Sequence, residues 1–205
     1  MKILLIALVL CGELFPQSYK WKEKHSVKQD SVYFVSDSVG YIPGRTINKT
    51  TDGGNNWVQY DTGFDNNLNA MFFIGPYKGW AVGAAGIILY TNDGGQSWTE
   101  QEKGLTNNFN SVYFVDDKTG WAVGDGGSMF KTNDSGAHWQ KVDSGVNTNL
   151  FKVFFIDSNE GFALGIGVTL KTTNGGNDWN IVRSKSAFSP NTIYFDKEKG
   201  WQQVK

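Results

Sequence analysis

The eight residues Thr91-Asn92-Asp93-Gly94-Gly95-Gln96-Ser97-Trp98 decide the fold of this chain, because they recur at a fixed spacing. Similar stretches occupy positions 50–57, 132–139 and 172–179, the last with Asn174 at the Asp position. The four copies end at Trp57, Trp98, Trp139 and Trp179, which are 41, 41 and 40 residues apart. Repeats of this length are typical of β-propellers, in which each unit is one blade.

Two further markers recur in the same register. The stretch Gly79-Trp80-Ala81-Val82-Gly83 is repeated at 120–124, and weaker copies begin at Gly161, Gly40 and Gly200. A β-branched and aromatic segment precedes each copy, at 31–34, 70–73, 111–114, 152–155 and 192–195. Three markers in one register over five copies exclude a chance similarity.

One unit divides into four short strands separated by turn residues. In the unit that contains Trp121, we expect strands at 111–115, 120–124, 128–132 and 138–142. No window has the 3.6-residue periodicity of a helix. We therefore predict an all-β fold, a β-propeller of four-stranded antiparallel blades with about four complete blades and partial units at both ends. The expected units are 27–66, 67–107, 108–148, 149–189 and a partial unit of 190–205 with 19–26.

The number of blades leaves two arrangements open. A seven-bladed ring needs about 287 residues, which is more than this chain contains. The chain is either a truncated copy of a larger propeller with exposed strand edges, or a five-blade ring in which segment 19–26 completes the last blade. We favour the truncated copy, because the sequence stops shortly after Gly200-Trp201, in the middle of a unit.

The repeated stretch has a structural explanation. Its Asp or Asn can accept hydrogen bonds from backbone N–H groups two or three residues further on, and so close the turn between the third and fourth strands. Gly95 supplies a positive φ, and the tryptophan covers the hairpin with a large apolar face. Four copies around a ring cannot all form one active site. We expect structural roles for Asp52, Trp57, Asp93, Trp98, Asp134, Trp139, Asn174 and Trp179.

Residues 1–18 have the pattern of a secretory signal peptide. Met1 and Lys2 precede an apolar run, Ile3 to Leu10, which is shorter than the about 20 residues that span a bilayer. A lipoprotein anchored at Cys11 and an uncleaved, buried N-terminal strand are the alternatives. We expect an exported protein without a transmembrane segment, located in the periplasm, at the cell surface or outside the cell.

Composition excludes several other classes. The aromatic content of 15% is incompatible with disorder, and the net charge of −1 argues against a nucleic-acid partner. The single cysteine cannot form a Cys-based zinc site, and His25 and His138 do not form a metal site or a catalytic triad. The Gly-Gly pairs belong to turns, so no phosphate-binding loop is present. We predict no cofactor and no metal.

The repeated stretch matches Ser/Thr-x-Asp-x-Gly-x-x-Trp, the Asp-box or bacterial neuraminidase (BNR) repeat. Together with Gly120-Trp121-Ala122-Val123-Gly124, it resembles the photosystem II assembly and stability factor family over residues 19–205. The resemblance implies an exported, seven-bladed propeller of the thylakoid lumen, although related sequences occur in bacteria that do not photosynthesise. That family carries an Arg-rich patch on one face, whereas this chain has only Arg45 and Arg183.

A binding site is expected on the face opposite the Asp-boxes, where the second strand of each blade connects to the third, and the fourth to the next blade. This face is rich in asparagine, whose amide both donates and accepts hydrogen bonds and suits a peptide or a glycan, although asparagine is also frequent in turns. Apolar residues there are expected to be core or rim anchors: Phe64, Leu68, Phe109, Leu150 and Phe188. The candidate binding residues are Arg45, Asn66, Asn67, Asn107, Asn108, Asp125, Asn147, Asn149 and Arg183.

Three functions stay open at this point. The first is a non-enzymatic scaffold that binds a protein partner, as the resemblance implies. The second is a secreted or envelope propeller of a non-photosynthetic bacterium in adhesion or glycan binding. The third is a sialidase-like glycoside hydrolase, which would need three arginines around the substrate carboxylate. Two arginines are present, and lysine does not replace the arginine fork, so we predict that the chain is not an enzyme.

Overall fold

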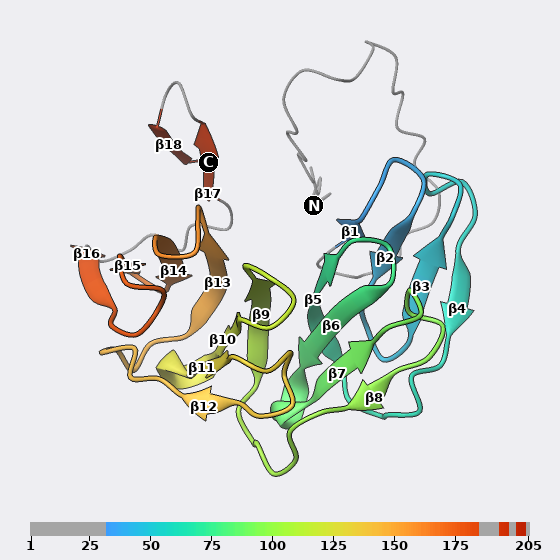
Figure 1. Cartoon of the computed structure of the whole chain (residues 1–205), viewed down its shortest axis with the longest axis horizontal. Helices are drawn as coiled ribbons and strands as arrows, with labels where there is room; N and C mark the ends of the chain where they lie inside the picture. The colour runs from blue at the N-terminus through green and yellow to red at the C-terminus, as the bar shows by residue number, and fades with distance from the viewer. Residues whose placement is uncertain (1–31, 185–192, 197–199, 204–205) are drawn as a thin grey trace, which may run out of the picture.

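The computed structural model describes residues 32–184, 193–196 and 200–203, and these residues form an all-β fold. Four sheets of four antiparallel strands follow one another along an arc (Figure 1), and strands pair only with their neighbours in sequence. The first blade contains β1 (Tyr33–Phe34), β2 (Gly40–Ile42), β3 (Ile47–Thr50) and β4 (Val58–Tyr60). The second contains β5 (Leu68–Ile74), β6 (Lys78–Gly83), β7 (Ile88–Thr91) and β8 (Thr99–Glu100).

The remaining blades repeat this pattern. The third contains β9 (Phe109–Phe114), β10 (Gly120–Gly124), β11 (Met129–Thr132) and β12 (Gln140–Lys141). The fourth contains β13 (Leu150–Phe155), β14 (Gly161–Gly165), β15 (Val168–Thr172) and β16 (Asn180–Ser184). The hairpin of β17 (Ile193–Asp196) and β18 (Gly200–Gln203) follows. Short 3-10 turns, η1 (Ala84–Gly86) and η2 (Asp125–Gly127), connect the second and third strands of the second and third blades.

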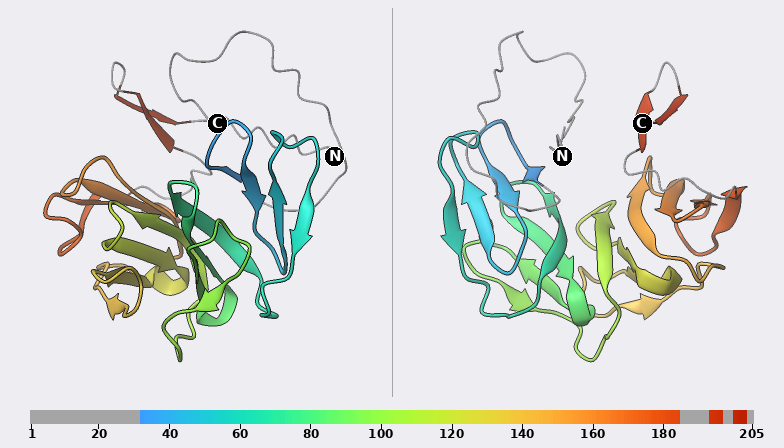
Figure 2. Two further views of the ribbon diagram at one scale, coloured as in Figure 1. Left: turned by 45° about the vertical axis from the view of Figure 1, so that its right-hand side comes forward. Right: turned by 180° about the vertical axis from the view of Figure 1, so that it is seen from behind.

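The predicted fold class is confirmed, with four complete blades. In the third blade, β10 has the expected bounds, and the other three strands differ from the expected ones by at most two residues at either end. The fourth strand is the shortest of its sheet in the second and third blades. Each first strand lies on the inner side of the arc, and each fourth strand lies on the outer side (Figures 1 and 2). Segment 19–26, which would complete the last blade in the five-blade alternative, lies outside the described residues.

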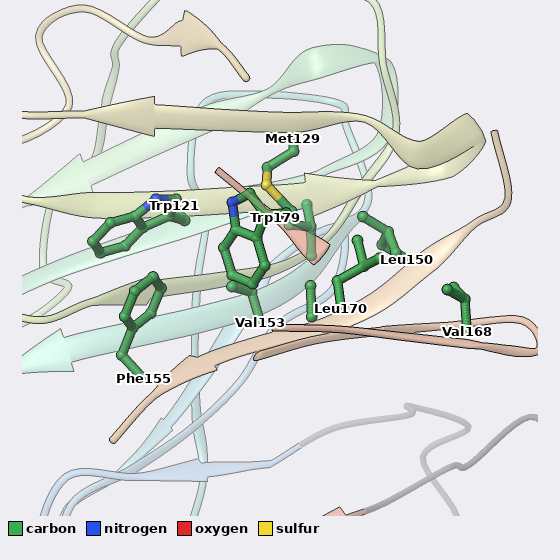
Figure 3. Packing of buried hydrophobic residues seen from close by; sticks show 10 residues of the cluster. Trp121, Met129, Leu150, Val153, Phe155, Val168, Leu170 and Trp179 are labelled. Atoms are coloured by element: carbon green, nitrogen blue, oxygen red, sulfur yellow. The ribbon is translucent and has the colours of Figure 1, made fainter. Parts of the chain in front are cut away.

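The hydrophobic core lies between blades, because each sheet packs face to face against the next. In the first three blades, an aromatic residue at the start of the second strand stacks on a phenylalanine in the first strand of the following blade. The ring centroids are 4.4 Å apart for Tyr41 and Phe73, and 3.6 Å apart for Trp80 and Phe114. Trp121 and Phe155 repeat the arrangement at 3.9 Å (Figure 3). This stacking explains the aromatic marker.

The position before each of these aromatic residues requires glycine because a ring lies against it. Gly120 lies directly across from Phe114 in the β9–β10 ladder, and the phenylalanine ring covers it. A Cβ atom at Gly120 would lie 2.6 Å from that ring. The same relation holds for Gly79 with Phe73 and for Gly161 with Phe155. Glycine therefore allows the stacked ring to lie flat on the neighbouring strand.

The Asp-box tryptophan completes each junction. Trp139 meets Phe114 edge-on, with an interplanar angle of 86°, and Trp179 meets Phe155 at 83°. Both indoles are nearly buried. Figure 3 shows one such cluster, in which Trp121 and Met129 of the third blade pack against Phe155 and Trp179 of the fourth. The three sequence markers thus meet in space at each junction.

Candidate functional site

Backbone hydrogen bonds divide the turns of the molecule into two faces. Gly94 N donates to Tyr77 O, and Ser135 N donates to Lys118 O, each at 2.9 Å. These bonds place the turn between the first and second strands beside the Asp-box, and we call this side the Asp-box face. On the other side, Ala84 N donates to Asn67 O at 2.9 Å. We call that side, which carries the connections after the second and fourth strands, the connection face.

The threonine hydroxyl and the carboxylate close each Asp-box turn together. Thr91 Oγ1 donates to Asp93 Oδ1 at 2.7 Å and accepts from Gly95 N at 2.9 Å. Asp93 Oδ1 also accepts from the N–H groups of Gln96 and Ser97. The carboxylate thus reaches three and four residues further on, rather than two or three as expected. The difference arises because the threonine hydroxyl, which is nearly buried, binds the closer N–H groups.

The carboxylates of the Asp-boxes are stabilised in their charged form. Backbone and side-chain hydrogen bonds from Asn56, followed by one from Thr50, lower the pKa of Asp52 to about 2. Hydrogen bonds from the backbone and side chain of His138 lower the pKa of Asp134 to about 2. Each carboxylate is therefore ionised at neutral pH, and its oxygens are occupied by internal donors. This arrangement suits a turn brace and not a general acid.

The fourth Asp-box reverses the polarity of one hydrogen bond. In the third box, Asp134 Oδ2 lies 2.7 Å from Nδ1 of His138, the residue four positions later. In the fourth box, Asn174 Nδ2 donates to Asp178 Oδ2 at 2.8 Å. The amide has replaced the carboxylate, and a carboxylate now stands where the donor was. Both arrangements close the same turn, which explains why Asn174 is tolerated.

The second, third and fourth Asp-boxes are also held by the preceding blade. Gly94 O accepts from Tyr41 Oη and from Lys49 Nζ, both at 2.7 Å. Ser135 O in the next box accepts from Trp80 Nε1 at 2.9 Å, and Gly175 O accepts from Lys131 Nζ at 2.8 Å. In these three boxes, the carbonyl at the same position is thus bonded across the junction. The Asp-box residues predicted to be structural all belong to this scaffold or to the aromatic junctions.

On the connection face, several of the candidate asparagines also join neighbouring blades. Asn108 Oδ1 accepts from Ala85 N at 3.0 Å, and Asn149 Oδ1 accepts from Gly126 N at 2.9 Å. Both donors belong to the preceding blade. Asn110 Nδ2 donates to Leu150 O of the next blade at 3.0 Å. These amides therefore set the spacing of the connections.

Other candidates brace a single connection. Asp125 accepts from the Nδ2 atoms of Asn108 and Asn110 through its two oxygens, at 3.0 and 2.9 Å. Asn107 Nδ2 donates to Ser128 Oγ at 2.7 Å, and Asn66 Nδ2 donates to Ala84 O at 3.2 Å. The structure thus brings Asn107, Asn108 and Asp125 together on the third blade.

Three candidates present their polar groups to solvent. The Arg45 side chain is 74% exposed, and its guanidinium lies 3.9 Å from the fully exposed Asp65 carboxylate. Such a pair contributes little to stability and can exchange partners. Asn147 is exposed, and Asn67 is exposed while donating to Asn69 Oδ1 at 3.1 Å. Arg183 lies in β16, opposite Thr169, and its side chain is outside the described part.

The apolar residues near this face anchor the connections. Leu68, Phe109 and Leu150 are buried at the start of their strands. Phe64 packs against the hydrophobic core between the first and second blades. Phe188 is outside the described residues. His138 is exposed on the Asp-box face, and no group of three metal-binding side chains occurs within the described ranges.

Sequence reasoning missed two sets of residues. The first set is the pair of lysines that bind the neighbouring Asp-box, Lys49 and Lys131. They could have been found because each directly precedes an Asp-box threonine, Thr50 or Thr132. A groove beside Tyr77 was also missed. Its signal is the turn Gly75-Pro76-Tyr77, which departs from the Asp-containing turns of the following blades.

Comparison with known proteins agrees with this architecture. The family model described as photosynthesis system II assembly factor YCF48 matches residues 17–103 and 100–173. The chain belongs to this family. No curated protein sequence gives a significant match.

Solved structures of the YCF48 family resemble the chain in fold. YCF48 bound to a D1 peptide has 22% identity and a TM-score of 0.65, over 82% of this chain and 57% of that one. YCF48 from Cyanidioschyzon merolae has 18% identity and a TM-score of 0.61, over 77% and 60%. The GH74 xyloglucanase from Xanthomonas campestris has 11% identity and a TM-score of 0.66, over 83% and 32%. This chain therefore spans less than two thirds of each of these structures.

Proposed function

We propose that this chain is an exported, non-enzymatic scaffold that binds an extended segment of a protein partner on its connection face. Membership of the YCF48 family supports a role in photosystem II assembly. The solved YCF48 structure with a D1 peptide supports a polypeptide ligand. One observation carries the choice of face. The polar groups of the Asp-boxes are bonded within the protein, whereas Arg45 and Asn147 on the connection face are exposed to solvent.

On the connection face, polar groups remain available at the surface. The Arg45 guanidinium has only a weak, exposed partner, and the Asn147 amide is exposed. A polypeptide backbone offers alternating donors and acceptors, which amides can bind at both ends. Arginine can bind a carboxylate of the partner through two parallel hydrogen bonds.

The proposal excludes catalysis and includes export. The two arginines are too few for a sialidase-type carboxylate clamp, and the likeness to GH74 enzymes extends only to the fold. Export is supported by the basic start and the short apolar run of residues 1–18, which lie outside the described part. Within that part, no helix has the length and hydropathy needed to cross a membrane.

Calorimetric titration with the D1 peptide tests the proposal. We expect the full chain to bind it, and Arg45→Ala together with Asn147→Ala to weaken binding by about tenfold, which corresponds to about 1.4 kcal/mol. Lys118→Ala is the matched control, because it removes an exposed cation from the Asp-box face. Absence of binding, or equal losses in the control and the double variant, would contradict the proposal.

A further inference from the structure

A groove on the Asp-box face, between the first and second blades, has no role in the function proposed above. Its volume is about 450 Å³, within the range of about 300–1,000 Å³ that is typical of small-molecule sites. Its apolar lining includes Val35, Val39, Pro76 and Tyr77. It lies on the opposite side of the molecule from Arg45 and Asn147.

The turn that forms one wall of the groove departs from the repeat. In the third and fourth blades this turn is closed by an aspartate: Asp116 Oδ1 accepts from Thr119 N, and Asp157 Oδ1 accepts from Glu160 N. The second blade instead has Gly75, with a φ of +66°, followed by Pro76. The change places Tyr77 in solvent with 67% of its surface exposed, the largest value among the exposed large hydrophobic residues described.

Folding does not account for this tyrosine side chain. The bond that ties the turn to the Asp-box uses the backbone carbonyl of Tyr77, which accepts from Gly94 N at 2.9 Å. In the third and fourth blades, the backbone carbonyls of Lys118 and Asn159 accept the corresponding bonds from Ser135 N and Gly175 N. Any residue could therefore supply that carbonyl, and the exposed ring stays available to a ligand in the groove.

The two charged residues of the groove lining, Lys49 and Asp93, have opposite charges and are held by contacts within the protein. Lys49 Nζ donates to Gly94 O at 2.7 Å and lies 5.5 Å from the centre of the Tyr41 ring. The Asp93 carboxylate accepts from Thr91, Gln96 and Ser97. The lining therefore carries no net charge, and a charged ligand would compete with these contacts. The groove is therefore complementary to a neutral ligand.

The polar groups at the rim are hydroxyls and an amide. Ser36, Thr51 and Gln96 line the groove and are exposed. A sugar ring has C–H groups on its faces, which pack on an aromatic ring, and hydroxyls at its edge, which exchange hydrogen bonds with such side chains. We propose that this groove is a binding site for a neutral oligosaccharide, with Tyr77 as the platform for one sugar ring.

Calorimetric titration of the full chain with neutral hexasaccharides, namely cellohexaose, xylohexaose and mannohexaose, tests this site. We expect binding of at least one of them. Tyr77→Ala should weaken it by at least about fivefold, because the stacking surface is lost. Tyr77→Phe keeps the ring and should stay within about twofold. Ile166→Ala, which removes an exposed apolar side chain from the connection face, is the matched control and should bind like the unmodified chain.

Three results would overturn the inference. The first is that no hexasaccharide binds, and the second is that Tyr77→Ala binds as well as the unmodified chain. The third is Tyr77-dependent binding of decaproline without binding of sugars, which would make the groove a peptide site. If the urea unfolding of Tyr77→Ala is unchanged, a loss of sugar binding is due to the missing side chain and not to unfolding. Since the D1 peptide is expected on the other face, failure here leaves that proposal intact.

Discussion

The Asp-box face and the connection face are built from the same repeats but use their polar residues differently. On the Asp-box face, Thr132 and Asp134 make the same contacts as Thr91 and Asp93 in the blade before. On the connection face, Asn108 is bonded to the preceding blade, whereas Asn147 is exposed. Contacts that repeat from blade to blade hold the blades together, and residues that depart from the repeat are free to bind a partner.

Removing an aromatic side chain from a junction between blades should have the largest effect on the free energy of unfolding. Trp121 is fully buried and stacks on Phe155 of the next blade. Trp121→Ala should lower the free energy of unfolding by about 3–5 kcal/mol, because it leaves a cavity between two sheets. Asn147→Ala on the connection face should change it by less than about 0.5 kcal/mol. Urea unfolding measures both, and equal effects would contradict the division of roles.

Adding one methyl group beneath a stacked ring should be the next largest change. Gly120→Ala would place a Cβ 2.6 Å from the Phe114 ring, and such overpacking costs about 1–3 kcal/mol. Phe114→Leu removes that ring, so the double variant should lose less than the two single variants together. Strictly additive losses in urea unfolding would show that the ring does not explain the glycine.

Removing the hydroxyl of an Asp-box should have a similar or smaller effect. Thr132 Oγ1 accepts from Gly136 N at 2.9 Å and is nearly buried. Thr132→Val keeps the shape but leaves that N–H without a partner, which costs about 1–3 kcal/mol. Thr148→Val on the connection face removes a longer bond, of 3.3 Å to Ile166 O, and should cost less. The reverse order in thermal or urea unfolding would contradict the structural role of the Asp-box.

The smallest effects concern the pH dependence of stability. Substitutions in the third and fourth Asp-boxes should change that dependence in opposite directions. The pKa of Asp134 is about 2 in the folded state, below about 3.9 in the unfolded state. Its stabilisation is therefore present above pH 4 and is lost as the pH falls through 2. Asp134→Asn should make the urea midpoint fall less between these pH values.

In the fourth box, Asn174→Asp would place a second carboxylate beside Asp178, where the atoms are now 2.8 Å apart. Repulsion between like charges raises the pKa of such a pair. This variant should be less stable than the unmodified chain at pH 7 and should recover relative to it as the pH falls to 4. Parallel pH profiles for all three proteins would show that these hydrogen bonds do not matter.

The fold could be predicted because its signals are local and repeated. Each Asp-box and each Gly-Trp pair lies within a few residues of the turn or strand that it forms. The stacking partner of Trp80 could not be predicted. Phe114 lies in the next blade and comes close to Trp80 only because neighbouring blades pack face to face. The roles of the asparagines could not be predicted for the same reason. Asn108 differs from Asn147 only because a backbone N–H of the preceding blade lies within hydrogen-bond distance of it.

The central claim is that the connection face binds an extended polypeptide, while the Asp-box face holds neighbouring blades together. Hydrogen–deuterium exchange of the full chain, with and without the D1 peptide, tests it most directly. The account predicts slower exchange at residues 44–46, 65–69, 106–110 and 145–149, and no change in the Asp-box turns. Protection confined to the Asp-box turns, or no protection at a peptide concentration that saturates YCF48, would contradict it.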